Sequence, residues 1–172
     1  MMTSESRPLW APWRLSYIVK PKDNGCFLCE AMANPQADLE NHVIFRGRSC
    51  FVILNRFPYT SGHAMIAPYR HVPGIVDLTP EECQETLALE VRLQKSLVKA
   101  MGPQGFNFGF NLGEAAGAGV ADHLHGHLVP RWHGDNNFMP VLADVHVVPQ
   151  ALEETARILR AAWLELFPEM PV

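Results

Sequence analysis

The stretch that decides the fold reads His123-Leu124-His125-Gly126-His127-Leu128-Val129. Its histidines alternate with apolar residues or glycine, a period of two that is typical of a β-strand. Since residues two apart on a strand share a face, we expect the three imidazole rings to project together from a strand that runs to Arg131. Three of the eight histidines of the chain lie within five residues, which indicates a chemical role rather than packing.

A row of imidazoles serves two chemistries. Either three rings jointly hold one metal ion, or one ring attacks an electrophile while its neighbours fix its protonation. Just before the histidines, Gly117-Ala118-Gly119 offers backbone N–H groups that a phosphate can approach without steric hindrance. Together the two features predict a phosphorus-transfer enzyme that uses a histidine nucleophile on a nucleoside phosphate.

The rest of the chain predicts further strands. Segments rich in β-branched and aromatic residues, bounded by turn residues, are typical of strands, and four precede the histidines: Val43–Arg46, Cys50–Leu54, His63–Ala67 and Phe106–Asn111. With the histidine strand they make five. The first two are joined by a short Gly-containing turn, as in a hairpin, and we expect a mainly antiparallel sheet.

Two helices complete the predicted fold. Thr79-Pro80-Glu81-Glu82 has the N-cap hydroxyl, the proline and the carboxylate that start a helix, and Gly102-Pro103 ends it. Its apolar stripe contains Leu89, Leu93 and Leu97, widened by Val91 and Val98. A closing helix is expected over Ala151 to Phe167, with three residues facing inward: Leu159, Trp163 and Leu166. The fold class is α+β.

The composition indicates a single domain over residues 1–172, in which an N-terminal segment, 1–24, and a C-terminal extension, 133–172, flank the motifs. Hydrophobic residues make up 48% and charged residues 19%, as in an ordinary globular protein. A net charge of −4 argues against a nucleic-acid partner. With no apolar stretch typical of a signal peptide or a membrane span, we expect a cytoplasmic protein without a membrane partner.

The pair Cys26-Phe27-Leu28-Cys29 has the spacing of a zinc knuckle. Thiolate and imidazole ligands suit a closed tetrahedral zinc site, and the alternative is a pair of reduced cysteines without metal. A third interpretation is a catalytic metal held jointly by His123, His125 and His127. Soft thiolates offer zinc a better site than these imidazoles do, so the cysteine pair weighs against it.

At this point the sequence resembles the histidine triad (HIT) superfamily. The resemblance covers roughly residues 25 to 132 and rests on the alternating histidines and on matching segments before and after the third strand: Leu54-Asn55-Arg56, Ser61-Gly62-His63 and Ala67-Pro68-Tyr69-Arg70-His71. Flanking motifs are similar to those of bacterial diadenosine-tetraphosphate phosphorylase-like members, namely Leu9-Trp10-Ala11-Pro12-Trp13-Arg14 and Pro130-Arg131-Trp132. The resemblance implies a HIT-like fold and a homodimer.

The resemblance also implies roles for particular residues. His125 would be the nucleophile that attacks an α-phosphorus and becomes nucleotidylated, and His127 would bind the phosphate oxygens. Structural zinc would be bound by four ligands, Cys26, Cys29, His71 and His123.

The other candidate contacts are less specific. We expect Asn55 to bind ribose hydroxyls, since an amide both accepts and donates, with a strand-end cap as the alternative. Asn111 and the backbone of Gly117 and Gly119 are candidates for phosphate. His63 could reach the phosphates or pack within its strand, and Trp132 could stack on a base or pack.

These expectations describe an enzyme that cleaves nucleoside or dinucleoside polyphosphates, of the diadenosine tetraphosphate type, at the α-phosphate. Hydrolysis and phosphorolysis both stay open. Gly119 stands where the hydrolase branch carries glutamine, and Gly117-Ala118-Gly119 stands where phosphorylase-like members more often carry Gly-Gly-Ser. The alternative function is a non-catalytic nucleotide-binding regulator, against which the retention of His125 and His127 weighs.

Overall fold

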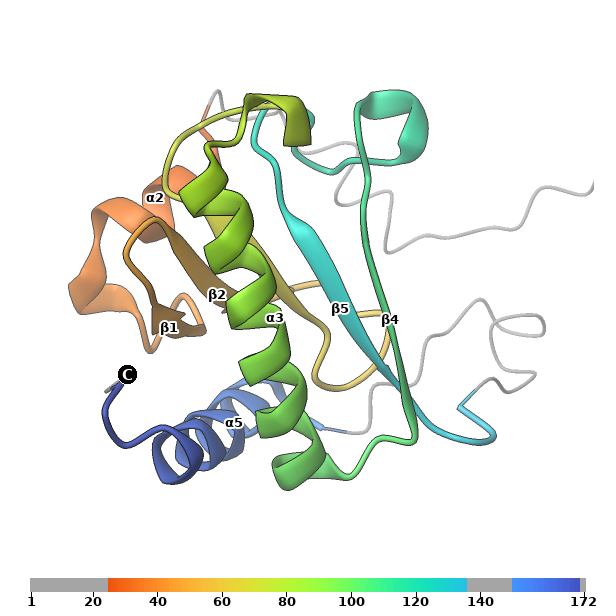
Figure 1. Ribbon diagram of the computed structural model, residues 1–172. Helices are drawn as coiled ribbons and strands as arrows, with labels where there is room; N and C mark the ends of the chain where they lie inside the picture. The colour runs from red at the N-terminus through yellow and green to blue at the C-terminus, as the bar shows by residue number, and fades with distance from the viewer. Residues whose placement is uncertain (1–24, 136–149, 171–172) are drawn as a thin grey trace, which may run out of the picture.

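The computed structural model describes residues 25–135 and 150–170. The N-terminal segment and much of the C-terminal extension therefore lie outside the described residues. The centre is a five-stranded sheet in the order β1-β2-β3-β5-β4, and every neighbouring pair is antiparallel (Figure 1). The strands are β1 (Val43–Arg46), β2 (Cys50–Leu54), β3 (Ala64–Pro68), β4 (Gly105–Phe110) and β5 (Gly126–Arg131). The α+β class and the antiparallel sheet are confirmed.

The long helix α3 (Pro80–Met101) begins as its sequence predicts. The Thr79 hydroxyl accepts from the Glu82 N–H, and the Glu82 carboxylate accepts from the Thr79 N–H, which is a complete capping box. Gly102 ends the helix in the left-handed conformation at φ 59°, which glycine adopts without steric cost. The C-terminal helix α5 (Leu152–Leu166) also lies where it was expected.

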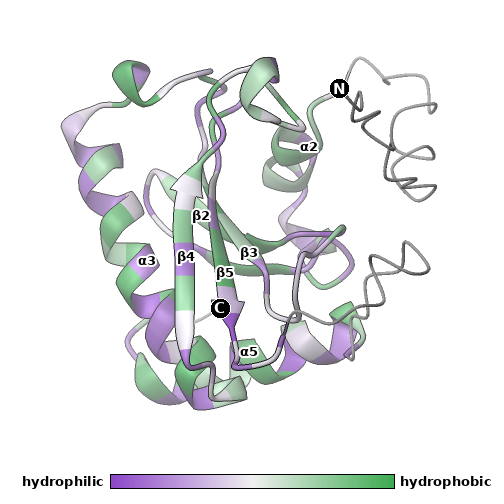
Figure 2. Ribbon diagram, turned by 90° about the vertical axis from the view of Figure 1, so that its right-hand side faces the viewer, coloured by the Kyte–Doolittle hydropathy of each residue, from purple (hydrophilic) through white to green (hydrophobic). Residues whose placement is uncertain are grey.

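The sheet separates two apolar clusters. On one face, Leu89, Leu93 and Leu97 of α3 pack with Leu159 and Trp163 of α5 against alternate residues of the strands. On the other face, α2 (Phe27–Ala33) covers β1, β2 and β3. Figure 2 shows α3 and α2 on opposite sides of the sheet. No helix within the described ranges has an apolar stretch long enough to cross a membrane.

The histidine stretch differs from the prediction at its start. Strand β5 begins at Gly126, so His123 and His125 precede it. Pairing with β3 starts at Ile66 opposite Gly126, whereas the Leu124 N–H donates to the Val72 carbonyl at 2.7 Å. The chain is therefore held by the segment after β3 rather than by the sheet. That arrangement gives the first two rings freedom to point in different directions.

The predicted apolar stripes were too wide. The side chains of Val91 and Val98 are 50% and 53% exposed, and Leu166 of α5 is 38% exposed. A helix that packs on one sheet buries only the line of residues that faces it, which on α3 is Leu89, Leu93 and Leu97. The helix α2 and three short 3-10 helices, η1 (Pro35–Ala37), η2 (Ile75–Asp77) and η3 (Glu114–Ala116), were not predicted.

Gly126 is required by a close approach of aromatic rings. A Cβ atom there would lie 3.0 Å from the Phe110 ring and 3.2 Å from the Phe108 ring, on the face turned away from His127. We therefore expect Gly126→Ala to lower the free energy of unfolding by about 1 kcal/mol, because the rings must shift from a packed position. Urea denaturation measures this change.

Gly105→Ala is the matched control, since a Cβ at this β4 glycine meets no atom within 4 Å. The loss caused by Gly126→Ala should shrink when Phe110 is replaced by alanine, which removes the ring. An equal loss in both backgrounds would contradict the steric explanation.

Candidate active site and metal centre

Four predicted ligands come together at one edge of the structure. Cys26, Cys29, His71 and His123 each offer one ligand atom, and these atoms all lie within 4.8 Å of one another. The His123 Nδ1 is 3.2 Å from the Cys26 Sγ and 3.4 Å from the Cys29 Sγ, and the His71 Nδ1 is 3.2 Å from the Cys29 Sγ. Ligand atoms of tetrahedral zinc lie roughly 3.4–3.8 Å apart, so the set is of the right size.

The protonation of His123 fits a metal ligand. Its Nε2 lies 2.9 Å from the Pro68 carbonyl oxygen, which only accepts, so Nε2 carries the proton and Nδ1 presents its lone pair to the two sulfur atoms. A metal-binding histidine commonly donates its other N–H in this way, which fixes the ring. Burial lowers the pKa of His123 and keeps the ring neutral.

The cysteine pair lies at the start of α2, and side-chain hydrogen bonds from β1 hold the end of this helix. Cys26 precedes α2 and Cys29 lies within it. Arg46 of β1 donates to the carbonyls of Ala31 and Met32 at the end of α2, and a bidentate ion pair with Asp38 holds the guanidinium. Burial raises the pKa of the Cys29 thiol to about 11, with the neighbouring Cys26 as a further cause, so Cys29 needs a nearby cation to become thiolate at neutral pH.

His125 has the geometry of a nitrogen nucleophile. Its Nδ1 donates to the backbone carbonyl of His123 at 2.8 Å, which leaves the lone pair on Nε2. The ring is buried, and this burial lowers its pKa, so the neutral, nucleophilic form is the one present at neutral pH. The same residue, His123, thus contacts the cysteine pair with its side chain and orients His125 with its backbone.

His127 belongs to a second hydrogen-bonded chain. The Tyr59 N–H donates to the His63 Nδ1 at 3.2 Å, so the proton of neutral His63 is on Nε2. That N–H donates to the His127 Nδ1 at 3.0 Å, and the His127 proton must then be on its own Nε2. Within the described residues this N–H is buried and has no partner. An unpartnered buried donor is costly, and a phosphate oxygen would satisfy it.

The pKa values agree with this assignment. Burial, with His127 and His125 as further causes, lowers the pKa of His63 to about 3. Burial likewise lowers the pKa of His127 to about 4, with His125 as the second cause. Both rings are neutral at neutral pH, so each carries the single proton that the hydrogen-bond chain requires.

The comparison with known proteins agrees with this geometry. The profile of the HIT domain matches residues 36–134, more than half of the chain. The chain belongs to the HIT family. It is 38% identical to an AP-4-A phosphorylase from Mycobacterium tuberculosis, over 90% of this chain and 83% of that protein. It is 30% identical to the asymmetrical bis(5'-nucleosyl)-tetraphosphatase of Schizosaccharomyces pombe, over 55% of this chain and 52% of that protein.

A solved HIT structure agrees as well. A zinc-bound histidine triad family protein from Mycobacterium smegmatis superposes with a TM-score of 0.67 at 27% identity, covering 85% of this chain and 98% of that one. Within the described residues the Cys26, Cys29, His71 and His123 group is the one cluster of metal-ligating side chains. A joint metal site of the three triad histidines is therefore not formed, because the His123 ring turns to the cysteines.

The other residues predicted to contact the substrate have different surroundings in the structure. Asn111 lines a cleft of about 230 Å³ together with His127. The Asn55 side chain accepts from the Phe57 N–H at 2.8 Å, which is the local capping that we had kept as the alternative. The Gly117 N–H donates to the Glu114 carbonyl within the loop after β4. Gly119 lies in the same loop, and Trp132 follows β5 with its N–H on Asp135.

Sequence reasoning missed three residues of the site. Tyr59 supplies the first donor of the His63–His127 chain, Pro68 supplies the carbonyl for His123, and Arg46 anchors α2. Tyr59 and Pro68 act through backbone groups, which leave no trace in residue type. An aromatic residue four positions before His63, in a turn, was the one available signal.

Proposed function

We propose that this HIT protein cleaves dinucleoside polyphosphates, of the diadenosine tetraphosphate type, at the α-phosphate through a covalent nucleotidyl-His125. The observation that carries the proposal is the His125 ring, with its proton held on Nδ1 by the His123 carbonyl. A buried, neutral imidazole fixed in this tautomer is an activated nucleophile. The names of the relatives above support the same substrate class.

The reaction has two balanced steps. The His125 Nε2 lone pair attacks the α-phosphorus, the bond to the bridging oxygen of the β-phosphate breaks, and ATP leaves. The ring now carries positive charge, which strengthens its hydrogen bond to the His123 carbonyl. The His127 N–H donates to an oxygen of the reacting phosphates, where negative charge gathers. An acceptor then takes the AMP group from His125 and restores the lone pair.

We propose inorganic phosphate as that acceptor. The relative that matches over 90% of this chain is named as a phosphorylase, whereas the tetraphosphatase matches over 55%. Phosphate attack on the nucleotidyl-histidine yields ADP, and water would yield AMP. The products therefore separate the two acceptors.

The test is a product assay with diadenosine tetraphosphate, with and without inorganic phosphate. We expect ADP only when phosphate is present, and without phosphate we expect no more than the single equivalent of ATP that the first step releases. In His125→Ala we expect turnover to fall by about a thousandfold or more, because the nucleophile is gone. Without phosphate, acid-free trapping should isolate AMP bound to the wild type.

His133→Ala is the control, since His133 is exposed and lies beyond β5. AMP formed without phosphate would replace phosphorolysis by hydrolysis. Full activity in His125→Ala would end the mechanism, and a wild type that binds nucleotide without turnover would favour the regulatory alternative.

We further propose that the Cys26, Cys29, His71 and His123 group binds structural zinc. The lone pair of the His123 Nδ1 faces both sulfur atoms, which supports a tetrahedral site. The metal supplies rigidity, because it fixes the residue whose carbonyl orients His125. Reduced cysteines are required, so we also propose a cytoplasmic location.

Metal analysis of purified protein should give about one zinc per chain, and Cys26→Ser should lose most of it, since thiolates contribute strongly to such sites. Cys83→Ser is the matched control, because Cys83 lies on α3 outside the group. Zinc that persists in Cys26→Ser but disappears in His125→Ala would instead support a metal held by the triad.

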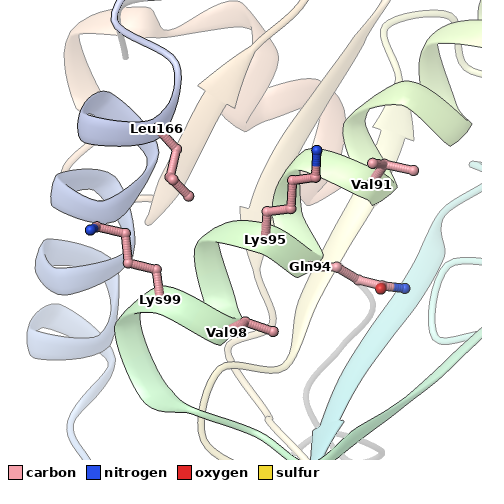
Figure 3. A pocket seen from close by; sticks show the side chains of 6 residues that line it. All are labelled: Val91, Gln94, Lys95, Val98, Lys99 and Leu166. Carbon is pink, nitrogen blue, oxygen red and sulfur yellow. The ribbon is translucent and has the colours of Figure 1, made fainter.

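The homodimer is also a proposal. β4 is an edge strand of six residues, so one side of its backbone is not paired in the described sheet. On the outer side of α3, Leu87, Val91 and Val98 are exposed. Figure 3 shows Val91 and Val98 beside a groove of about 540 Å³, with Leu166 of α5 across it. A second copy would cover both surfaces.

We expect light scattering to give the mass of a dimer, and the double variant Val91→Glu and Val98→Glu to give a monomer with unchanged secondary structure, because charges enter the apolar contact. Leu39→Glu is the control, since Leu39 is exposed but far along the chain from α3. A monomeric wild type, or a dimer that survives the double substitution, would contradict this interface.

A further inference from the structure

The cleft beside the triad extends to one side of the nucleophile. It is lined by Tyr59, Asn107, Asn111, His127 and Val129, on the sheet face that carries the His127 ring. Among the triad histidines, only His127 lines it. The space thus lies beside the last histidine and runs along β4 and the neighbouring part of β5.

The in-line geometry of the proposed reaction puts the leaving group in this cleft. In phosphoryl transfer the attacking atom, the phosphorus and the leaving oxygen lie roughly in line, so the leaving nucleotide departs on the side opposite the His125 Nε2. The unpartnered N–H of His127 is the donor between His125 and the cleft. A phosphate chain bound by that donor continues into the cleft.

Tyr59 forms an aromatic wall of this cleft. Its side chain is 53% exposed, although its ring is held in place. The ring lies against His63, with centroids 4.6 Å apart at 33°, and 6.4 Å from the His127 ring at 25°. The turn is fixed as well, because the Thr60 hydroxyl donates to the Pro130 carbonyl of β5 at 2.9 Å. An exposed aromatic ring in a fixed position is a platform for a nucleobase.

We infer that Tyr59 stacks on the base of the leaving nucleotide and thereby selects substrates with two nucleosides. The inference rests on the proposed function, since it assigns the second half of the same substrate. A phosphate chain without a second base would pass His127 in the same way but would gain nothing from Tyr59. Specificity for dinucleoside over mononucleoside polyphosphates therefore depends on this side chain.

The test compares kcat/KM for diadenosine tetraphosphate and for adenosine 5'-tetraphosphate, which has the same phosphate chain and no second nucleoside. Tyr59→Ala should reduce the preference for the dinucleotide about tenfold, the usual effect of losing one base–aromatic stack. Tyr59→Phe keeps the ring and should keep the preference. The Tyr59 N–H to His63 is retained in both variants.

Phe57→Ala is the control, because Phe57 is an exposed aromatic residue of the same turn that does not line the cleft. An unchanged preference in Tyr59→Ala, or an equal loss with both substrates, would overturn the inference. An equal fall of the preference in Phe57→Ala would overturn it too, since the effect would belong to the turn. A wild type that consumes neither substrate would contradict the proposed function itself.

Discussion

Three bonds of one residue, His123, hold the site together. Its Nδ1 faces the cysteine pair, its Nε2–H donates to Pro68 at the end of β3, and its own carbonyl accepts from His125. The side-chain contacts help to hold the residue in place, and its carbonyl keeps the His125 proton on Nδ1. The orientation of His125, the proposed nucleophile, therefore depends on the backbone of a residue whose side chain faces the cysteine pair. This explains why a reactive ring can lie before a strand rather than within it.

A second constraint is that four neutral histidines are buried or half-buried: His63, His123 and His125 are buried, and His127 is half-buried. Burial lowers the pKa of His63, His123, His125 and His127, so each ring carries one proton whose position is decided by a neighbour. Two of these neighbours are carbonyl oxygens, and a third is the backbone N–H of Tyr59. The backbone thus determines which ring nitrogen presents a lone pair and which one donates a proton. Among these four rings, within the described residues, the His127 N–H alone has no partner, and a substrate could satisfy it.

The sequence predicted the secondary structure well and the directions of the side chains poorly. The capping box at Thr79 and the five strands follow local rules, and the ligand set was implied by a resemblance rather than by spacing. A period of two placed three rings on one face, but β5 begins at Gly126, because Leu124 bonds to Val72 across the fold. The rings of Phe110 and Phe108 fill the space beside Gly126, a contact that the motif itself does not show. Such contacts join residues distant in sequence, so no local pattern contains them.

The position of the cleft follows from unequal cover of the sheet. α3 and α5 bury one face with a continuous apolar cluster, while on the other face the cluster with α2 contains residues of β1, β2 and β3 only. Beyond β3, the face of β5 and β4 carries His127, Val129 and Asn107, and no described helix packs over it. The α2 helix carries Cys29 to His123. This helix therefore covers β1, β2 and β3 and does not extend over β4. The contact between α2 and His123 thereby leaves the neighbouring strands uncovered by any described helix, which is where the proposed substrate cleft lies.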